Sequence, residues 1–163
     1  MSEAETDAED LPEEPAERVE ALLEEIVDAL DLDGEIVVDE RDEEIAARIE
    51  GDELGLLIGR RGQTIDAVQL LCYRVAFRGR GDRKRVSVDA AGYRERRRET
   101  IERQAERAAE RALESGKEIE LEPMTPTERK IVHDQLKDRP GLETFSEGEE
   151  PERCVIVAPL VGD

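Results

Sequence analysis

The sequence is poor in the residues that build most catalytic and metal sites. It has one histidine, His133, and two cysteines, Cys72 and Cys154, neither of which belongs to a CxxC pair. A zinc site needs clustered cysteine and histidine ligands, so we expect no bound metal. No serine or cysteine lies in a nucleophile elbow, and no P-loop is present. We therefore predict a protein that is not an enzyme, with no catalytic residue, no cofactor and no small-molecule substrate.

Long apolar runs are also missing. No stretch approaches the ~18 apolar residues that suggest a membrane-spanning helix. The N-terminus, MSEAETDAEDLPEEP, has neither the basic region nor the apolar core of a secretory signal. Both cysteines lie in apolar stretches, LLCYRVAF and RCVIVAP. We predict two buried thiols instead of a disulfide, in a cytoplasmic protein without a membrane span.

Charge is abundant but unevenly distributed. Charged residues make up 42% of the chain, apolar residues only 37%, and the formal net charge is -20. Residues 1–55 hold 23 acidic and 3 basic side chains, whereas residues 60–111 hold 15 basic and 8 acidic ones. Binding of a phosphate depends on the local potential, so the net charge does not exclude a nucleic acid partner. We interpret residues 1–14 as a disordered acidic tail, which either solubilises the protein or competes with an anionic ligand for residues 60–111.

Hydrophobic periodicity predicts a first unit over residues 15–91. Apolar residues recur at helical spacing, then alternate, then return to helical spacing around a GRRG sequence. Asp52 is placed to cap the helix before this sequence. We expect, in order, a helix over 16–33 that Gly34 ends, strands over 35–41 and 43–51, a short helix up to residue 58, a helix carrying Ile65, Val68, Cys72 and Val75, and a strand over 83–90.

A second unit is predicted over residues 92–163. Its long charged helix, 93–115, has a narrow apolar stripe of Ile101, Ala105, Ala108 or Ala109, and Ala112. A short strand over 118–123 precedes a helix that a capping box, Thr125 to Glu128, starts. Strands over 141–148 and 153–160 follow. The last strand is continuously apolar, so we place it centrally in a sheet and assign the whole chain to the α+β class.

The sequence Gly59-Arg60-Arg61-Gly62 lies between two apolar helical segments. Without Cβ atoms, the glycines would let a sugar-phosphate backbone approach the main chain. The following helix would direct its free N–H groups toward an anion, and the two arginines would add fixed charge. Glycines also commonly end and link helices. These residues alone support a phosphate site and a plain turn equally.

A second motif is formed by Arg129, Lys130 and His133. Arg129 and His133 are four residues apart and share one face of the capped helix, with Lys130 and Lys137 close to it. Val132 and Leu136 point elsewhere and can enter the core. The alternative is that His133 is a hydrogen-bonded structural residue, and the residues alone favour this alternative.

The order helix-strand-strand-helix-GxxG-helix-strand, with LLIGRRGQTIDAVQLL at its centre, resembles a type II KH domain. KH domains clamp about four nucleotides of a single strand with the GxxG loop. The resemblance implies that residues 59–62 are the clamp and that Ile58 and Ile65 flank the base groove. TERKIVHDQL is similar to the signature of the Arg-x-x-x-His (R-3-H) domain, which implies a second nucleic acid contact at Arg129, Lys130 and His133.

A KH domain followed by an R-3-H domain resembles the Jag (SpoIIIJ-associated) family of bacterial RNA-binding proteins, over residues 16–161. The resemblance implies a regulator of cell growth and division. Its partners would be single-stranded RNA, or single-stranded DNA, and a small stand-alone KH protein in a heterodimer. Family members usually carry a further N-terminal domain, rich in lysine and glutamate, where this sequence has only the acidic tail.

Aromatic residues are scarce in this sequence, with two tyrosines, two phenylalanines and no tryptophan. Stacking on aromatic rings supplies about 1–3 kcal/mol per base, so we expect modest, salt-sensitive binding with little sequence discrimination. The alternative function is a protein-interaction adaptor, which would use the apolar KH surface and the charged helix to bind partner proteins.

Overall fold

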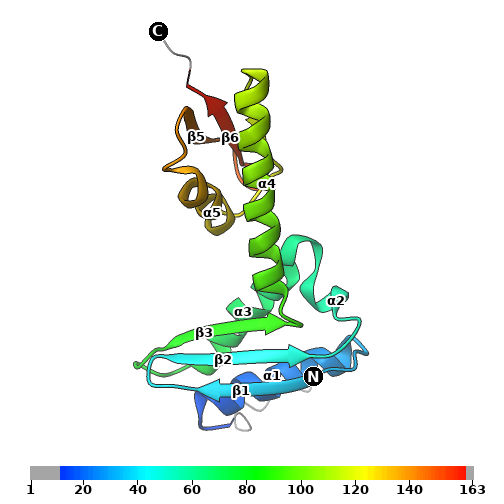
Figure 1. Ribbon diagram of the computed structural model, residues 1–163. Coiled ribbons are helices and arrows are strands. Elements are labelled where there is room, and N and C mark those ends of the chain that lie inside the picture. The colour runs from blue at the N-terminus through cyan, green and yellow to red at the C-terminus, as the bar shows by residue number, and fades with distance from the viewer. Residues whose placement is uncertain (1–11, 161–163) are drawn as a thin grey trace, which may run out of the picture. The chain divides into compact units, whose positions relative to one another are not determined.

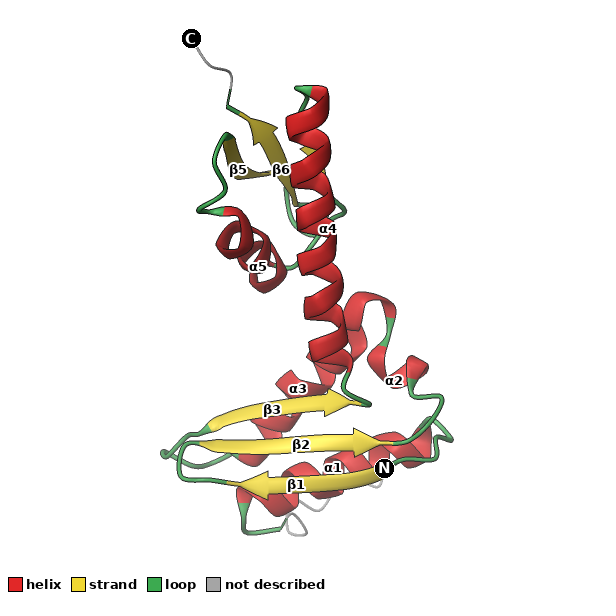
Figure 2. Ribbon diagram, in the orientation of Figure 1, coloured by secondary structure: helices red, strands yellow, loops and turns green. Residues whose placement is uncertain are grey.

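The structure, a computed structural model, describes residues 12–160 and divides the chain into two compact units (Figures 1 and 2). The first unit ends at Arg94 and the second begins at Glu95, just inside the long helix α4 (Tyr93–Ser115). Helices and strands occur in both units, which confirms the predicted α+β class. None of the helices in the described part of the chain is long and apolar enough to cross a membrane.

The first unit has the element order that the sequence predicts, and this order is that of a type II KH domain. A single 3-10 turn, Arg60–Gly62, joins its second and third helices. The elements are α1 (Pro15–Ala29), β1 (Glu35–Glu40), β2 (Glu44–Glu50), α2 (Gly55–Ile58), α3 (Gln63–Ala76) and β3 (Arg85–Ala90).

The three strands of this unit form one sheet with the order β1-β2-β3, antiparallel at the first pair and parallel at the second. Helices α1 and α3 lie behind the sheet in the view of Figure 1. Alternate residues of β2 and β3 point into the core beneath these helices, where Ile45, Ile49 and Val88 are fully buried. The core therefore holds α3, and the loop before it, against the sheet.

The end of α1 differs from the prediction. The helix ends at Ala29, and Leu30 and Asp31 close it by donating main-chain hydrogen bonds to Ile26 and Asp28. Gly34 lies beyond the helix end, and a Cβ placed there would lie 2.7 Å from Cγ2 of Ile49. Gly34 therefore permits a close approach to β2, which the local sequence pattern does not reveal.

The predicted cap of α2 is also wrong. The helix begins at Gly55, its N-cap position is taken by the buried Leu54, and no side chain accepts a capping hydrogen bond. Asp52 lies two residues before the N-cap position, too early in the chain to cap this helix. Burial of Leu54 and Leu57 therefore holds this four-residue helix in place without a polar cap.

The second unit packs two helices against a three-stranded antiparallel sheet. Its strand order is β4-β6-β5, so the predicted central position of the last strand is confirmed. The first strand is shorter than predicted, with only two residues in the ladder. The elements after α4 are β4 (Ile119–Glu120), α5 (Pro126–Leu136), β5 (Leu142–Glu147) and β6 (Cys154–Pro159).

Small side chains let α4 lie close to the rest of this unit. The predicted stripe is confirmed, since Ile101 and four alanines of α4 are buried. The predicted capping box also forms, with Thr125 accepting from the N–H of Glu128 and Glu128 accepting from the N–H of Thr125. Both cysteines are free and buried, as predicted, and burial raises the pKa of Cys72 to about 12.

Candidate nucleic-acid interface

Three of the four residues of the GRRG loop have positive φ, and the conformation of one of them, Gly59, is nearly exclusive to glycine. Gly59 follows α2 with φ 74° and ψ -179°, a region essentially closed to residues with a Cβ. Gly62 precedes α3 in the left-handed conformation, with φ 76°. Arg61 is also left-handed, with φ 53° and ψ 29°, so the loop turns sharply between the two helices.

The loop's own packing explains the two glycines better than the approach of a ligand does. A Cβ on Gly59 would lie 2.1 Å from Oγ1 of Thr64, and a Cβ on Gly62 would lie 2.6 Å from the ring of Tyr93. Neighbouring protein atoms therefore occupy the space that a side chain would need at each of the two glycines. The absence of a Cβ serves to fold the loop, and the loop in turn presents its arginines.

The two arginines of the loop differ in exposure. Arg60 is exposed, and its side chain has no hydrogen bond or ion pair with any of the described residues. Arg61 is half-buried and does make a contact of its own within the protein. Helix α3 starts immediately after the loop, so the positive end of its dipole adds to the charge of Arg60.

The apolar residues beside the loop differ in exposure. Ile65 is fully buried under the loop, whereas Ile58 is half-buried. The side chain that reaches solvent is Leu56, which is 62% exposed and was missed in the sequence. A signal was present, because three consecutive apolar residues in a four-residue helix cannot all face the core.

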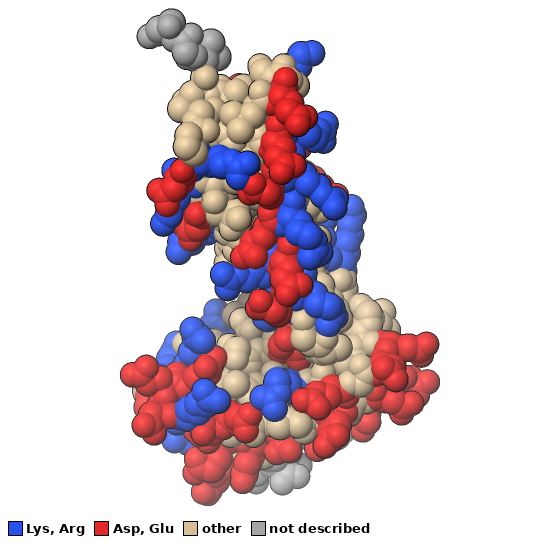
Figure 3. All heavy atoms as spheres, in the orientation of Figure 1, with Lys and Arg blue, Asp and Glu red and all other residues tan. Residues whose placement is uncertain are grey.

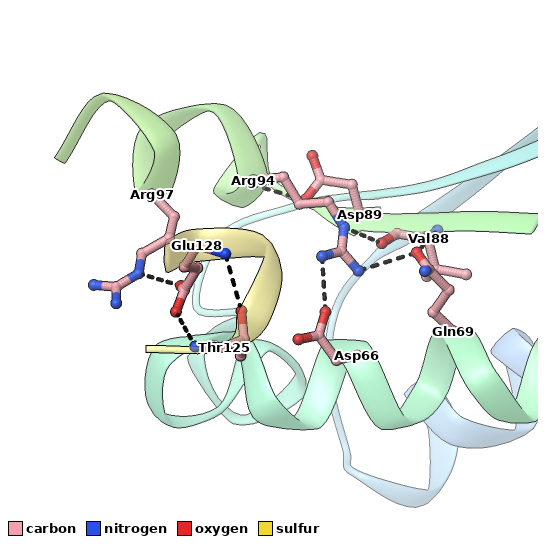
Figure 4. Close-up of polar contacts among 8 residues, drawn as sticks. All are labelled: Asp66, Gln69, Val88, Asp89, Arg94, Arg97, Thr125 and Glu128. Carbon is pink, nitrogen blue, oxygen red and sulfur yellow. Dashed lines mark hydrogen bonds and ion pairs between the residues drawn. The ribbon is translucent and has the colours of Figure 1, made fainter. Parts of the chain in front are cut away.

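A polar cluster holds α3 against the open edge of the sheet (Figure 4). Arg94 donates to the carbonyl oxygen of Val88 at 2.9 Å, to Asp66 at 2.8 Å and to the amide oxygen of Gln69 at 3.0 Å. Gln69 also accepts the N–H of Val88 at 2.9 Å. At Val88, the N–H and the carbonyl oxygen on the open edge of β3 therefore have side-chain partners. These contacts hold α3, the helix that follows the GRRG loop, in position.

In the second unit, Arg129 is placed for a structural role. It is only 8% exposed, and its guanidinium donates to the carbonyl of Met124 and to the carboxylate of Glu150. This ion pair lowers the pKa of the Glu150 carboxyl. Lys130, by contrast, points to solvent with a side chain that is 77% exposed and lies 3.7 Å from Asp134. Of the two, Lys130 is the residue that a ligand can reach.

His133 faces the sheet from α5. Its Nδ1 lies 2.7 Å from Oγ1 of Thr144, and its Nε2 lies 3.2 Å from Oγ of Ser146, both on β5. Burial and the positive charge of Arg129 lower the pKa of the ring, against an opposing effect of Asp134. The side chain is half-buried and neutral near pH 7, so it joins helix and strand while part of it stays exposed.

These two units match two domain families. The model of the KH domain of KhpA and KhpB proteins matches residues 16–89, and the model of the R-3-H domain matches residues 99–159. Fold and motifs therefore define a protein that carries a KH domain followed by an R-3-H domain. The GRRG loop lies in the first match, and Arg129, Lys130 and His133 lie in the second.

Curated relatives align with most of this chain. The chain is 40% identical to RNA-binding protein KhpB of Clostridium symbiosum over 139 residues, which cover 84% of this chain and 63% of the relative. It is 35% identical to RNA-binding protein KhpB of Bacillus subtilis over 147 residues, which cover 89% of this chain and 71% of the relative. It is 32% identical to the Streptococcus pneumoniae protein of that name, over 89% of this chain and 44% of the relative. The chain belongs to the KhpB (Jag) family and spans less than two thirds of the first of these relatives.

Proposed function

We propose that this protein binds single-stranded RNA through the GRRG loop of its KH domain. The observation that carries the proposal is Arg60, an exposed arginine on a glycine-determined loop directly before the N-terminus of α3. A phosphate at this place would meet a guanidinium fork and the first N–H groups of the helix. Leu56, exposed on the preceding helix, offers an apolar surface for a base. The names of the relatives support RNA as the ligand.

A second, weaker contact is proposed on α5. Lys130 supplies the accessible charge, and His133 supplies a ring edge that is already oriented by Thr144. Arg129 acts indirectly, since its pair with Glu150 holds the start of the helix. Two weak contacts on one chain raise the overall affinity through effective concentration.

The proposal is tested by reversing the charge of the loop. The full chain with Arg60→Asp and Arg61→Asp is titrated with a fluorescent oligouridylate at several salt concentrations. We expect affinity to fall about tenfold or more, and the slope of log K against log salt to shrink by about 0.7 for each lost phosphate contact. The matched control is Arg41→Asp with Arg78→Asp, which changes the net charge equally at two exposed positions of the same unit. Equal losses in both variants would refute a specific role of the loop.

A protein partner is the second candidate function, because α3 presents a pair of exposed leucines. Leu70 is 56% exposed and Leu71 is 51% exposed, next to each other on one helix. We propose that this pair contacts a small stand-alone KH protein in a heterodimer. Leu70→Ser with Leu71→Ser should abolish capture of that protein and leave oligouridylate binding intact. Retained capture would exclude this surface.

In the cell, we propose a non-catalytic, cytoplasmic regulator of growth and division that acts on bound RNA. This role rests on the family, and the loop variant allows a direct test. Crosslinking in cells, followed by sequencing of the bound RNA, should recover transcripts with the wild-type chain and lose them with Arg60→Asp and Arg61→Asp. Recovery of the same transcripts with the variant would contradict the proposal.

A further inference from the structure

Many charged residues of α4 are segregated along the helix, although Glu114 lies near Arg111 and Arg98 pairs with Glu102. Although glutamate and arginine interleave in the sequence, five glutamates of α4 recur at spacings of three and four residues on one side, and four arginines recur at spacings of four and seven on another. In Figure 3, acidic and basic side chains accordingly form separate columns along this part of the molecule. The basic side carries Arg96, Arg103, Arg107 and Arg111, and the acidic side carries Glu95, Glu99, Glu102, Glu106 and Glu110.

Charges of both sides are partly paired within the domain, since Arg103 of the basic side lies 4.0 Å from Glu99. On the acidic side, Glu106 pairs with Arg139 and Glu102 pairs with Arg98. On the basic side, Arg107 and Arg111 are exposed, and no hydrogen bond or ion pair of either side chain occurs within residues 12–160. The charges of these two arginines are therefore not paired within the described part of the domain, although Glu120 and Glu122 line the same groove.

A groove adjoins these arginines, between α4 and the segment around β4. Gln104, Arg107 and Arg111 line it from the helix, and Ile119 and Leu121 form part of its other wall together with Glu120 and Glu122. Its volume is about 220 Å³, below the ~300–1,000 Å³ of pockets for drug-sized ligands. The groove therefore suits a single group, such as one nucleobase, better than a whole cofactor.

Gln104 provides a second observation at the same place. Its amide oxygen is buried and has no hydrogen-bond partner among the described residues. A buried acceptor without a partner is unfavourable, so a donor that reaches it is favoured. Nucleobases and the 2′-hydroxyl group carry such donors, whereas the carboxylates of an acidic protein surface do not.

We propose that the basic side of α4 is an additional RNA contact, in which Arg107 and Arg111 bind backbone phosphates and the groove beside Gln104 receives a base or a ribose hydroxyl. Four residues of helix separate the two arginines by about 6 Å along the axis, so they can meet different phosphates of one strand. The two carboxylates of the groove wall restrict the anion to the helix side. The proposal rests on the proposed RNA-binding function and adds a surface that neither the GRRG loop nor the α5 face includes.

The test uses the full chain and an oligouridylate in rising salt. Arg107→Gln with Arg111→Gln should reduce the slope of log K against log salt by about 1.4, which is two contacts at about 0.7 each for a single strand. The matched control, Arg41→Gln with Arg98→Gln, removes the same charge from exposed positions outside the basic side of α4 and should leave the slope within error. Arg107→Lys with Arg111→Lys should restore the wild-type slope, because it keeps both charges.

The outcomes separate this inference from the function on which it rests. If the wild-type chain does not bind the oligouridylate, the proposed function itself fails. If wild type binds and the loop variant loses affinity, while Arg107→Gln with Arg111→Gln keeps the full salt slope, only the contact on α4 is overturned. An unchanged slope combined with loss of a protein partner would overturn it in favour of an acidic protein ligand. Circular dichroism of each variant verifies that the helix is intact.

Discussion

The amide oxygen of Gln69, in the middle of α3, accepts the main-chain N–H of Val88 on the open edge of the first sheet over 2.9 Å. An edge strand normally leaves such groups to solvent or to another strand. Here a side chain occupies the position of a fourth strand at this residue. The same oxygen also accepts from Arg94, so the helix, the strand edge and the first turn of α4 are joined at one atom.

We predict that Gln69→Ala makes the amide of Val88 exchange with solvent much faster than in the wild type. Loss of the acceptor leaves this N–H without its protein partner, and exchange then requires no opening of the sheet. Hydrogen exchange followed by NMR measures the effect at single residues. Gln63→Ala, at an exposed position at the start of α3, is the control and should leave Val88 protected. Slow exchange in both variants would show that Gln69 does not protect the edge.

The glycines of the GRRG loop allow a matched comparison. Gly59→Ala should destabilise the first unit by about 1–3 kcal/mol, because the new Cβ requires a backbone region that is nearly exclusive to glycine and meets Thr64 at 2.1 Å. Gly55→Ala, four residues earlier, meets nothing within 4 Å and should change stability by less than ~1 kcal/mol in either direction. Urea unfolding of both variants measures the difference. Similar midpoints for the two variants would contradict this account of the loop.

Much of the fold could be predicted because the local sequence patterns match the residues that are buried or that cap helices. The alternation in β2 and β3, the alanine stripe of α4 and the capping box at Thr125 each appear where the sequence places them. The failures arose where a residue acts through distant contacts. Gly34 looks like a helix terminator, but its lack of a Cβ is required by Ile49, which lies on β2.

The candidate site shows the same division between local and distant information. The position of the GRRG loop between two helices was readable from the sequence, whereas the burial of Ile65 and the exposure of Leu56 depend on how α2 packs. Arg129 looked like a surface ligand, yet it pairs with Glu150, a residue 21 positions away. Periodicity along one helix predicts which residues share a face of that helix. It does not predict which residues of another element pair with their charges.

The salt bridge between Arg97 and Glu128 is predicted to stabilise the second unit (Figure 4). The two groups lie 2.8 Å apart with side chains only 15% and 12% exposed, and Glu128 also closes the capping box of α5. Glu128→Gln removes the carboxylate charge that faces the guanidinium, so we expect a loss of about 2 kcal/mol. Glu102→Gln breaks the more exposed pair with Arg98 and should cost less than ~0.5 kcal/mol. Equal unfolding midpoints for the two variants would show that the Arg97 pair has no special weight.

Stability of the second unit should depend on pH through His133. Burial and Arg129 hold the pKa of the folded ring below its ordinary value of 6.5, so the unfolded chain takes up a proton at a higher pH than the folded one. The contribution of the neutral ring is therefore complete above pH ~6.5 and declines as pH falls below it, toward the folded pKa. His133→Gln, which does not titrate, should lack this decline between about pH 7.5 and about pH 5. Urea midpoints of the full chain across this pH range measure the decline in stability.

Glu150, whose pKa is lowered from 4.5, adds a loss of stability only in more acidic solution, so the effects of the two groups separate. Midpoints that fall in parallel for wild type and variant would exclude His133 as the titrating group.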